Sequence, residues 1–260
     1  MINLFQRRPH AWRTPSGDLY TLFDDMAKQP HLLIAGATGS GKSVVVNGII
    51  YNLLHNGPAK AGLILVDPKR TELKQFAHVP HVLMYADRIT SADRTSTNNT
   101  CLEALQYAKQ ITDSRFVTMQ KNGWREWQGG DVYVIIDELA ALMTTNKKAV
   151  QPIIQYLGII ARAAHVHLIC CTQTVKADIL PTTITCNFDS RVALRTSTAQ
   201  QSRMLIDVKG CEDFPSPIME HRALCYFKVG ADLLLYNVPK YSDSDVDKLV
   251  SYWTSEQCIA

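Results

Sequence analysis

A glycine-rich run with one lysine and one serine separates two apolar segments in the stretch HLLIAGATGSGKSVVV, residues 31–46. The run GATGSGKS fits the pattern G-x-x-x-x-G-K-[ST] and lies between a predicted strand and a predicted helix, the context that this pattern requires. Glycines let backbone N–H groups converge on an anion, and the following helix presents its positive dipole end to the same group. We therefore expect a phosphate-binding loop made of Gly36, Ala37, Thr38, Gly39, Ser40, Gly41, Lys42 and Ser43.

Two side chains of this loop have roles that the pattern specifies. Lys42 would reach the β- and γ-phosphates of a nucleotide, and the hydroxyl of Ser43 would bind Mg²⁺. The expected cofactors are therefore ATP and Mg²⁺. The alternative, a glycine-rich turn with a chance lysine, leaves the flanking strand and helix unexplained.

An acidic pair ends the apolar run VYVII downstream of this loop. Asp137 would deliver a carboxylate to the metal, where it holds a metal-bound water. Glu138 would orient or deprotonate the water that attacks the γ-phosphate. An Asp-Glu pair downstream of a phosphate loop favours hydrolysis of the nucleotide over binding alone.

A glutamine closes the next apolar run, LICCTQ. The neutral amide of Gln173 would contact the γ-phosphate or the attacking water and register the loss of the phosphate. The structural alternative is a turn residue that follows a strand.

Apolar runs alternate with segments of helical spacing along most of the chain, and this alternation predicts an α/β fold. Continuous apolar strands indicate a predominantly parallel sheet with helices on both faces, and such a sheet binds ligands outside the carboxyl ends of its strands. The functional candidates fall at these carboxyl ends: Gly36 to Ser43, Asp67, Asp137-Glu138 and Gln173. The expected strands are 31–37, 61–69, 82–87, 131–138, 166–173, 190–196, 223–230 and 232–238, and the expected helices are 42–57, 96–123, 149–165 and 242–256.

Composition is that of an ordinary soluble protein, with 46% hydrophobic and 20% charged residues. The formal net charge is only +3, so an acidic polymer would have to be met by local basic patches or by patches summed over several subunits. Seven cysteines without framework spacing indicate reduced thiols in a cytoplasmic protein, and Cys170-Cys171 lacks the second pair of a zinc site. No apolar run is long enough to span a bilayer, so any membrane association would come through a partner subunit.

Five segments together resemble the motor domain of the FtsK/SpoIIIE family of DNA translocases: PHLLIAGATGSGKSVVVNGII, LILVDPKRTEL, VYVIIDELAALM, ARAAHVHLICCTQ and SRVALR. The resemblance runs from about residue 15 to the final helix. It implies a RecA-like P-loop NTPase fold for residues 31–260, with residues 1–30 leading into it. It also implies an ATP site that contains Lys42, Ser43, Asp137, Glu138 and Gln173.

The same resemblance implies a homo-oligomeric ring, expected to be a hexamer, in which an arginine of one subunit reaches the nucleotide of its neighbour. Arg191, at the start of the strand 190–196, matches that residue. Arg162 and Arg195 are rival candidates, and an ordinary structural arginine is the alternative interpretation of Arg191. A trans-acting arginine would stabilise charge on the γ-phosphate and couple the subunits.

Double-stranded DNA is the expected partner, gripped through its phosphates by cations that line a pore. Lys147 and Lys148, in MTTNKKAV, correspond to a basic loop that faces DNA in the family; the alternative is a solvated turn. Lys121 and Arg125 alternate with tryptophans in QKNGWREWQGG, which suits nucleic acid or a subunit interface equally.

The sequence departs from the family pattern in two respects. Thr174-Val175 stand where an arginine and a proline usually follow the Thr-Gln pair, and the regions that larger members carry on either side of the motor do not appear here. We therefore expect a minimal or excised motor that loads on DNA without sequence specificity. Two other functions stay open: an ATPase of a secretion or conjugation system that moves polypeptide or single-stranded DNA, and a nucleotide-gated scaffold with negligible turnover.

Overall fold

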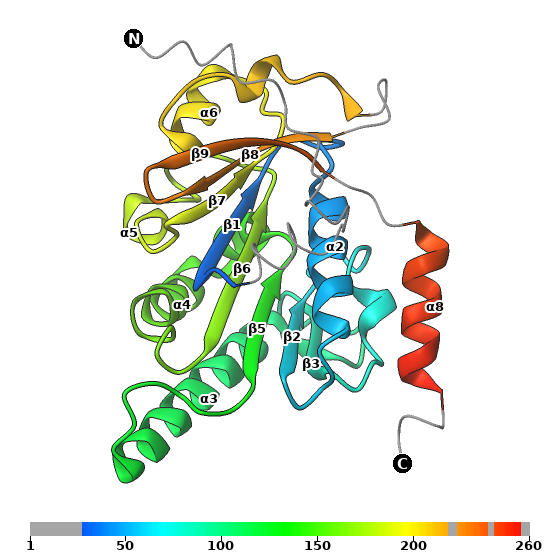
Figure 1. The fold of residues 1–260 in the computed structure, drawn as a ribbon, viewed down its shortest axis with the longest axis vertical. Helices are drawn as coiled ribbons and strands as arrows, with labels where there is room; N and C mark the ends of the chain where they lie inside the picture. Colours follow the sequence, from blue (N-terminus) through cyan, green and yellow to red (C-terminus); the bar gives the residue numbers. More distant parts are fainter. Residues whose placement is uncertain (1–27, 218–222, 239–241, 256–260) are drawn as a thin grey trace, which may run out of the picture.

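One nine-stranded sheet organises the protein in the computed structural model, which describes residues 28–217, 223–238 and 242–255 (Figure 1). Its strand order is β4-β3-β2-β5-β6-β1-β7-β8-β9. The strands are β1 (His31–Ala35), β2 (Ala61–Val66), β3 (Val82–Arg88), β4 (Asn99–Thr100), β5 (Asp131–Ile136), β6 (Val166–Thr172), β7 (Ser190–Ala193), β8 (Ala223–Val229) and β9 (Asp232–Val238).

Neighbouring strands pair in parallel along the sheet order from β4 through β3, β2, β5, β6 and β1 to β7. The pairs β7–β8 and β8–β9 are antiparallel. Every residue of β1 and of β2 is buried, as expected for central parallel strands that are covered on both faces. The predominantly parallel sheet predicted from the sequence is confirmed. The hairpin β8–β9 extends it at one edge.

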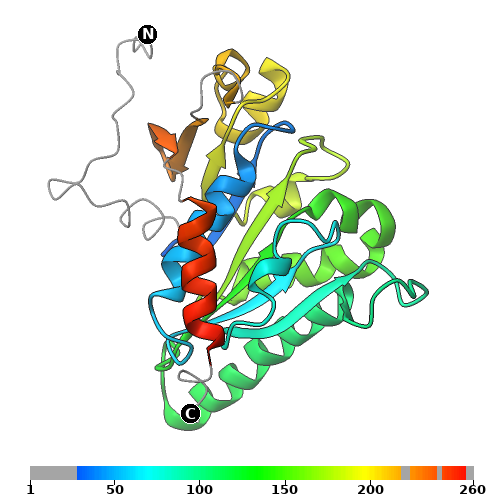
Figure 2. The ribbon, with the colours of Figure 1, turned by 90° about the vertical axis from the view of Figure 1, so that its right-hand side faces the viewer.

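Helices cover both faces, and each face has its own apolar cluster. One cluster joins the sheet to α3, α4, α5 and α6, and the other joins it to α2, the short helix η2 and α8. Figure 2 shows α8 running alongside α2. The helices are α2 (Lys42–Leu54), η2 (Lys74–Phe76), α3 (Cys101–Asn122), α4 (Leu139–Ile160), α5 (Thr182–Thr185), α6 (Ala199–Ile206), η3 (Cys211–Asp213) and α8 (Asp243–Thr254).

Local signals in the sequence explain where two of these helices begin and end. Thr100 and Glu103 form a capping box at the start of α3, and Gly123 ends that helix in the left-handed conformation with φ 67°. Ser242 and Asp245 form the same kind of box at the start of α8. Both predicted helices are confirmed, but α3 begins five residues after the expected start at 96, because residues 99 and 100 form β4.

The segment MTTNKKAV, predicted as a loop, lies instead inside α4, which begins directly after Glu138. Only Asn146 departs from helical geometry, with φ −142° and ψ 47°, so that two helical stretches meet there at a kink. Apolar residues at helical spacing on both sides, such as Leu142 and Val150, pack into the core and continue the helix through the polar segment. The prediction of a loop was wrong for this reason.

Residues 1–27 of the predicted N-terminal segment lie outside the described residues. Within the part of the chain that the structure describes, no helix has both the length and the apolar character needed to cross a bilayer.

Candidate active site

The predicted phosphate loop connects β1 to α2 at the carboxyl edge of the sheet. Gly39 and Gly41 adopt positive φ angles of 72° and 97°, a conformation that favours glycine. A Cβ on Gly36 would lie 2.5 Å from Ser40 Oγ, and one on Gly41 would lie 2.7 Å from the Cβ of Ala223. These glycines are therefore required by the path of the backbone itself.

The N-terminus of α2 has no side-chain cap. Gly41 is the N-cap and supplies no side-chain cap, and the first turn contains no acidic residue. The first backbone N–H groups and the positive end of the helix dipole are thus available to an anion. The loop is also anchored to the segment that follows β7, because the N–H of Ala37 donates to the carbonyl of Arg195 at 2.8 Å.

Lys42 and Asp137 form a buried pair beside this loop. Lys42 Nζ lies 3.6 Å from Asp137 Oδ1, and the exposed fractions of their side chains are 6% and 1%. Burial works to lower the pKa of Lys42, but Cys171, Asp137 and Glu138 outweigh it, so that the pKa is raised. The ammonium therefore keeps its charge in spite of its burial.

Asp137 has the character of a metal ligand. Burial raises the pKa of its carboxyl group; Lys42 counteracts this shift, while Asp67 adds to it. Neither carboxylate oxygen of Asp137 has a hydrogen-bond partner among the described residues, although both are buried. A divalent cation would supply positive charge to these oxygens, so Asp137, with the hydroxyl of Ser43 next to Lys42 in the chain, fits Mg²⁺.

Glu138 is held by three donors from outside its own helix. Its Oε2 accepts from Lys69 Nζ at 2.8 Å. Its Oε1 accepts from Thr172 Oγ1 at 3.0 Å and from the N–H of Gln173 at 3.1 Å. Sequence reasoning missed Lys69 and Thr172 as partners of Glu138, although Lys69 lies in the run DPK and Thr172 directly precedes Gln173.

Gln173 meets the phosphate loop through its side chain. Its Oε1 accepts a hydrogen bond from Thr38 Oγ1 at 3.1 Å. One residue thus contacts Glu138 through its backbone and the phosphate loop through its amide. This arrangement is what a residue that registers the γ-phosphate would need, and its role stays a prediction.

Arg191 is occupied within its own chain. Its guanidinium donates to the carbonyls of Phe188, Thr185 and Leu205, each at 3.0 Å. These bonds tie β7 to the neighbouring segments. The geometry favours the structural interpretation of Arg191 that the sequence left open.

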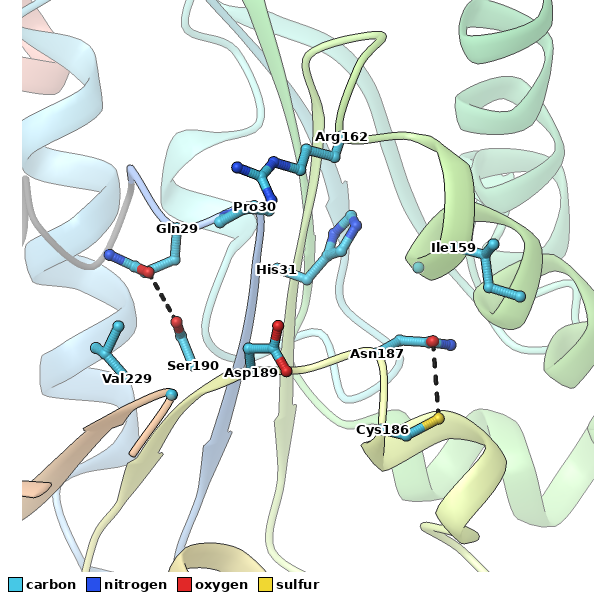
Figure 3. Close-up of a pocket in the computed structure, with 12 residues that line it drawn as sticks. Gln29, Pro30, His31, Ile159, Arg162, Cys186, Asn187, Asp189, Ser190 and Val229 are labelled. Atoms are coloured by element: carbon cyan, nitrogen blue, oxygen red, sulfur yellow. Dashed lines mark hydrogen bonds between the residues drawn. The ribbon is translucent and has the colours of Figure 1, made fainter. Parts of the chain in front are cut away.

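The two rival arginines lie near opposite ends of the parallel strands: Arg195 at the carboxyl ends and Arg162 at the amino ends. The backbone of Arg195 anchors the phosphate loop of its own chain. Arg162 is exposed at the end of α4 and lines a cavity of about 570 Å³ with His31, the first residue of β1 (Figure 3). No hydrogen bond or ion pair engages the Arg162 side chain within residues 28–217, 223–238 and 242–255, so it is free to act on another molecule.

The candidate DNA contacts are exposed but lie apart from one another. Lys147 donates to the carbonyl of Asp178 at 2.7 Å, in the segment that follows Gln173, and Lys148 is exposed beside it. Lys121 and Arg125 are exposed near the end of α3, next to the amino end of β5 and thus at the opposite edge from the phosphate loop. The structure therefore offers two separate basic surfaces.

The two tryptophans beside Lys121 and Arg125 differ in how far they pack within the chain. Trp127 donates its backbone N–H to the carbonyl of Ala163 at 2.9 Å, and its ring lies under Arg115 at 4.8 Å. Trp124 is 39% exposed and meets Trp127 edge-on. Only Trp124 is therefore available to a partner.

Cys170 and Cys171 are buried in β6, and burial raises the pKa of both thiols. The described ranges contain no group of three or more histidine, cysteine, aspartate or glutamate side chains placed to hold a metal ion. Both thiols belong to the apolar clusters on the two faces of the sheet.

Known proteins share both sequence and fold with this chain. It is 32% identical over 254 residues to the DNA translocase SpoIIIE of Bacillus subtilis (strain 168), a match that covers 90% of this chain and 31% of that protein. It is 36% identical over 208 residues to the DNA translocase FtsK of Streptococcus pneumoniae (strain ATCC BAA-255 / R6), covering 72% and 26%. The chain thus spans about a third or less of the length of these relatives.

Two solved structures share the fold at lower identity. The pCW3 conjugation coupling protein TcpA, in its monomer form with ATPgS, has a TM-score of 0.69 at 22% identity, covering 88% of this chain and 66% of that chain. The cytoplasmic domain of the Thermomonospora curvata type VII secretion ATPase EccC has a TM-score of 0.64 at 18% identity, covering 86% and 28%. Both likenesses support the predicted α/β fold of P-loop ATPases.

The model of the FtsK/SpoIIIE family matches residues 16–209, a span that includes the phosphate loop, the acidic pair and Gln173. The match covers well over half of the chain. The protein therefore belongs to the FtsK/SpoIIIE family.

Proposed function

We propose that this chain is the motor subunit of an ATP-driven DNA translocase. It binds and hydrolyses ATP, and it couples hydrolysis to the movement of double-stranded DNA through a ring of like subunits, without sequence specificity. The observation that carries the proposal is the convergence of Lys42, Asp137, Glu138 and Gln173 on one phosphate loop. Relatives named DNA translocase support the choice of cargo.

Each side chain has a part in the reaction that follows from its position. The backbone of the loop and Lys42 bind the phosphates and offset the charge that develops on the γ-phosphate. Ser43 and Asp137 would hold Mg²⁺, which would supply positive charge to offset that of the phosphates. Glu138 accepts the proton of the attacking water, and Gln173 links that glutamate to the loop.

An arginine from a neighbouring subunit would complete the site. We assign the trans-acting arginine to Arg162, because its side chain is exposed and unengaged within the described residues, whereas Arg191 is tied to three carbonyls of its own chain. A hexameric ring, a motor unit over residues 31–260 and an anchoring partner at the membrane are parts of the same proposal.

Lys42→Ala is expected to abolish ATP turnover, because it removes the buried cation that faces the phosphates. The measurement is steady-state ATP hydrolysis together with binding of a fluorescent ATP analogue. A matched control is Lys60→Ala, an exposed lysine directly before β2, at the opposite end of the strand from the phosphate loop. Turnover by the Lys42→Ala chain at the wild-type rate would contradict the assignment of the site.

The double variant Lys147→Ala/Lys148→Ala is expected to keep the ATPase rate measured without DNA and to lose its stimulation by duplex DNA. Each lysine that contacts a phosphate contributes about one unit to the slope of log affinity against log salt concentration. The slope for duplex binding should therefore be lower in the variant. Lys121→Ala/Arg125→Ala is the comparison: if that pair and not the first abolishes stimulation, the DNA surface lies at the end of α3.

A different cargo is the main alternative, an ATPase of a secretion or conjugation system. Proteins named for conjugation coupling and for type VII secretion share this fold. Stimulation of the ATPase by single-stranded DNA or by a polypeptide, with no response to duplex DNA, would favour it. Oligomerisation driven by ATP with negligible turnover would favour a nucleotide-gated scaffold.

A further inference from the structure

Lys69 meets the acidic pair from a turn that is distant in sequence. Its Nζ lies 2.8 Å from Glu138 Oε2, in an ion pair whose side chains are 36% and 5% exposed. Lys69 belongs to the turn that follows β2, whereas Glu138 follows β5, the strand paired with β2. Two adjacent parallel strands therefore deliver the cation and the carboxylate to the same edge of the sheet.

The turn that carries Lys69 is firmly built. The N–H of Asp67 donates to the carbonyl of Ala86 at 2.9 Å, and Asp67 Oδ2 accepts from the N–H of Leu73 at 3.0 Å. The first bond ties the start of the turn to β3, and the second closes the turn on itself across Lys69. The position of the Lys69 backbone is thus set by the sheet.

The next residue, Arg70, adds to this rigidity. It has a φ of 63°, uncommon for a residue other than glycine, and its Nε donates to the carbonyl of Asp87 at 3.2 Å. Its guanidinium also pairs with the carboxylate of Asp93. Arg70 is therefore committed to holding the turn, which leaves Lys69 as the cation directed at Glu138.

The carboxylate of Glu138 has no restraint from its own helix. Glu138 is the N-cap of α4, yet its side chain makes no capping hydrogen bond. Its orientation depends on Lys69 at one oxygen and on Thr172 and Gln173 at the other. A carboxylate with hydrogen bonds at both oxygens has few accessible rotamers. Removal of the Lys69 contact would leave Oε2 without a partner among the described residues and increase the number of orientations open to the carboxylate.

We propose that Lys69 is a positioning residue: it orients the carboxylate of Glu138 so that the carboxylate can accept the proton of the attacking water. The inference rests on the proposed ATPase function. Lys69 acts through Glu138 and is not required for nucleotide to bind. Its partial exposure places the ammonium at the mouth of the site, while the carboxylate that it orients stays buried.

Lys69→Met is expected to lower kcat about 10- to 100-fold, the scale of effect of a misplaced catalytic group. KM for ATP and the affinity for a fluorescent ATP analogue should change by less than about threefold, because the interaction lost is needed only for the chemical step. Lys69→Arg should recover most of kcat, since a guanidinium also pairs with a carboxylate. Lys74→Met, an exposed lysine on η2, is the matched control and should behave as wild type.

A second comparison tests whether Lys69 acts through Glu138. In the Glu138→Gln background, adding Lys69→Met should not reduce the residual single-turnover rate further. A further reduction, an unchanged kcat in Lys69→Met alone, a loss of nucleotide binding, or no recovery in Lys69→Arg would each overturn the proposal. Failure of the wild-type chain to hydrolyse ATP would refute the proposed function itself, a result distinct from any of these.

Discussion

Glu138→Gln is expected to reduce ATP turnover by about 10²- to 10⁴-fold, the contribution typical of a general base. Glutamine keeps the size of the side chain and its place beside Lys69 and Thr172, but the amide cannot take a proton from water. Nucleotide binding should persist, because the phosphate loop and Lys42 are untouched. The measurement is single-turnover hydrolysis of ATP alongside the affinity for a fluorescent ATP analogue.

A matched control for this variant is Glu103→Gln, which removes a carboxylate from the capping box of α3, far from the phosphate loop. It should leave both turnover and stability near the wild-type values, because glutamine at this position can also complete a capping box. Hydrolysis by Glu138→Gln at a rate close to that of the wild type would remove Glu138 from the reaction.

Arg162→Ala is expected to lower kcat by about 10³- to 10⁵-fold, the range for an arginine that stabilises phosphoryl transfer across a subunit boundary. The residue lies at the amino edge of the sheet, opposite the phosphate loop of its own chain, so its effect must be on a neighbour. Stability of the isolated chain should change little, because the side chain is exposed. Thermal unfolding and steady-state hydrolysis together separate the two effects.

Mixed assemblies test the trans assignment directly. A Lys42→Ala chain has a defective phosphate loop but an intact Arg162, and an Arg162→Ala chain has the reverse. Mixing the two inactive chains should restore part of the activity, since some subunit interfaces then combine an intact phosphate loop with an intact Arg162. No recovery on mixing, with both chains folded and assembled, would contradict a trans role for Arg162.

Arg191→Ala serves as the comparison, because its expected effect is on the fold. Loss of its three bonds to backbone carbonyls should lower the free energy of unfolding by about 2–3 kcal/mol, the scale of a hydrogen bond to a charged group. A folded Arg191→Ala chain whose hydrolysis recovers on mixing with Lys42→Ala would instead make Arg191 the trans-acting residue.

Much of the fold was predictable because its elements carry local signals. Continuous apolar strands marked the parallel core, and the serine and aspartate at its start marked the last helix, α8. The kinked course of α4 was not predictable from MTTNKKAV. That polar run has the composition of a loop, and only the packing of the apolar residues on either side holds it in a helix.

The site was predictable as a set of strand ends, but not as a network of contacts. Lys42, Asp137 and Glu138 follow from spacing, since parallel strands bring their carboxyl ends together. The contact between Lys69 and Glu138 spans 69 residues and depends on the order β2–β5 in the sheet. The arginines show the same limit: sequence spacing favoured Arg191, whereas its bonds to backbone carbonyls become visible only in three dimensions.

In the proposed motor, this network would provide a connection between the nucleotide and DNA. Gln173 contacts Glu138 and Thr38 at one end of a segment whose Asp178 carbonyl accepts from Lys147 at the other end. A shift of Gln173 when the γ-phosphate leaves would therefore reach a predicted DNA contact through a few residues. Loss of DNA stimulation in Lys147→Ala/Lys148→Ala would be consistent with this connection.

The steady-state ATPase rate of the purified chain, with and without long duplex DNA and across a range of salt concentrations, tests the central claim most directly. We expect a basal rate that rises severalfold with duplex DNA, a stimulation that falls steeply as salt increases, and no activity in Lys42→Ala with or without DNA. A wild-type chain that consumes no ATP under any of these conditions, or one whose turnover ignores duplex DNA throughout, would contradict it.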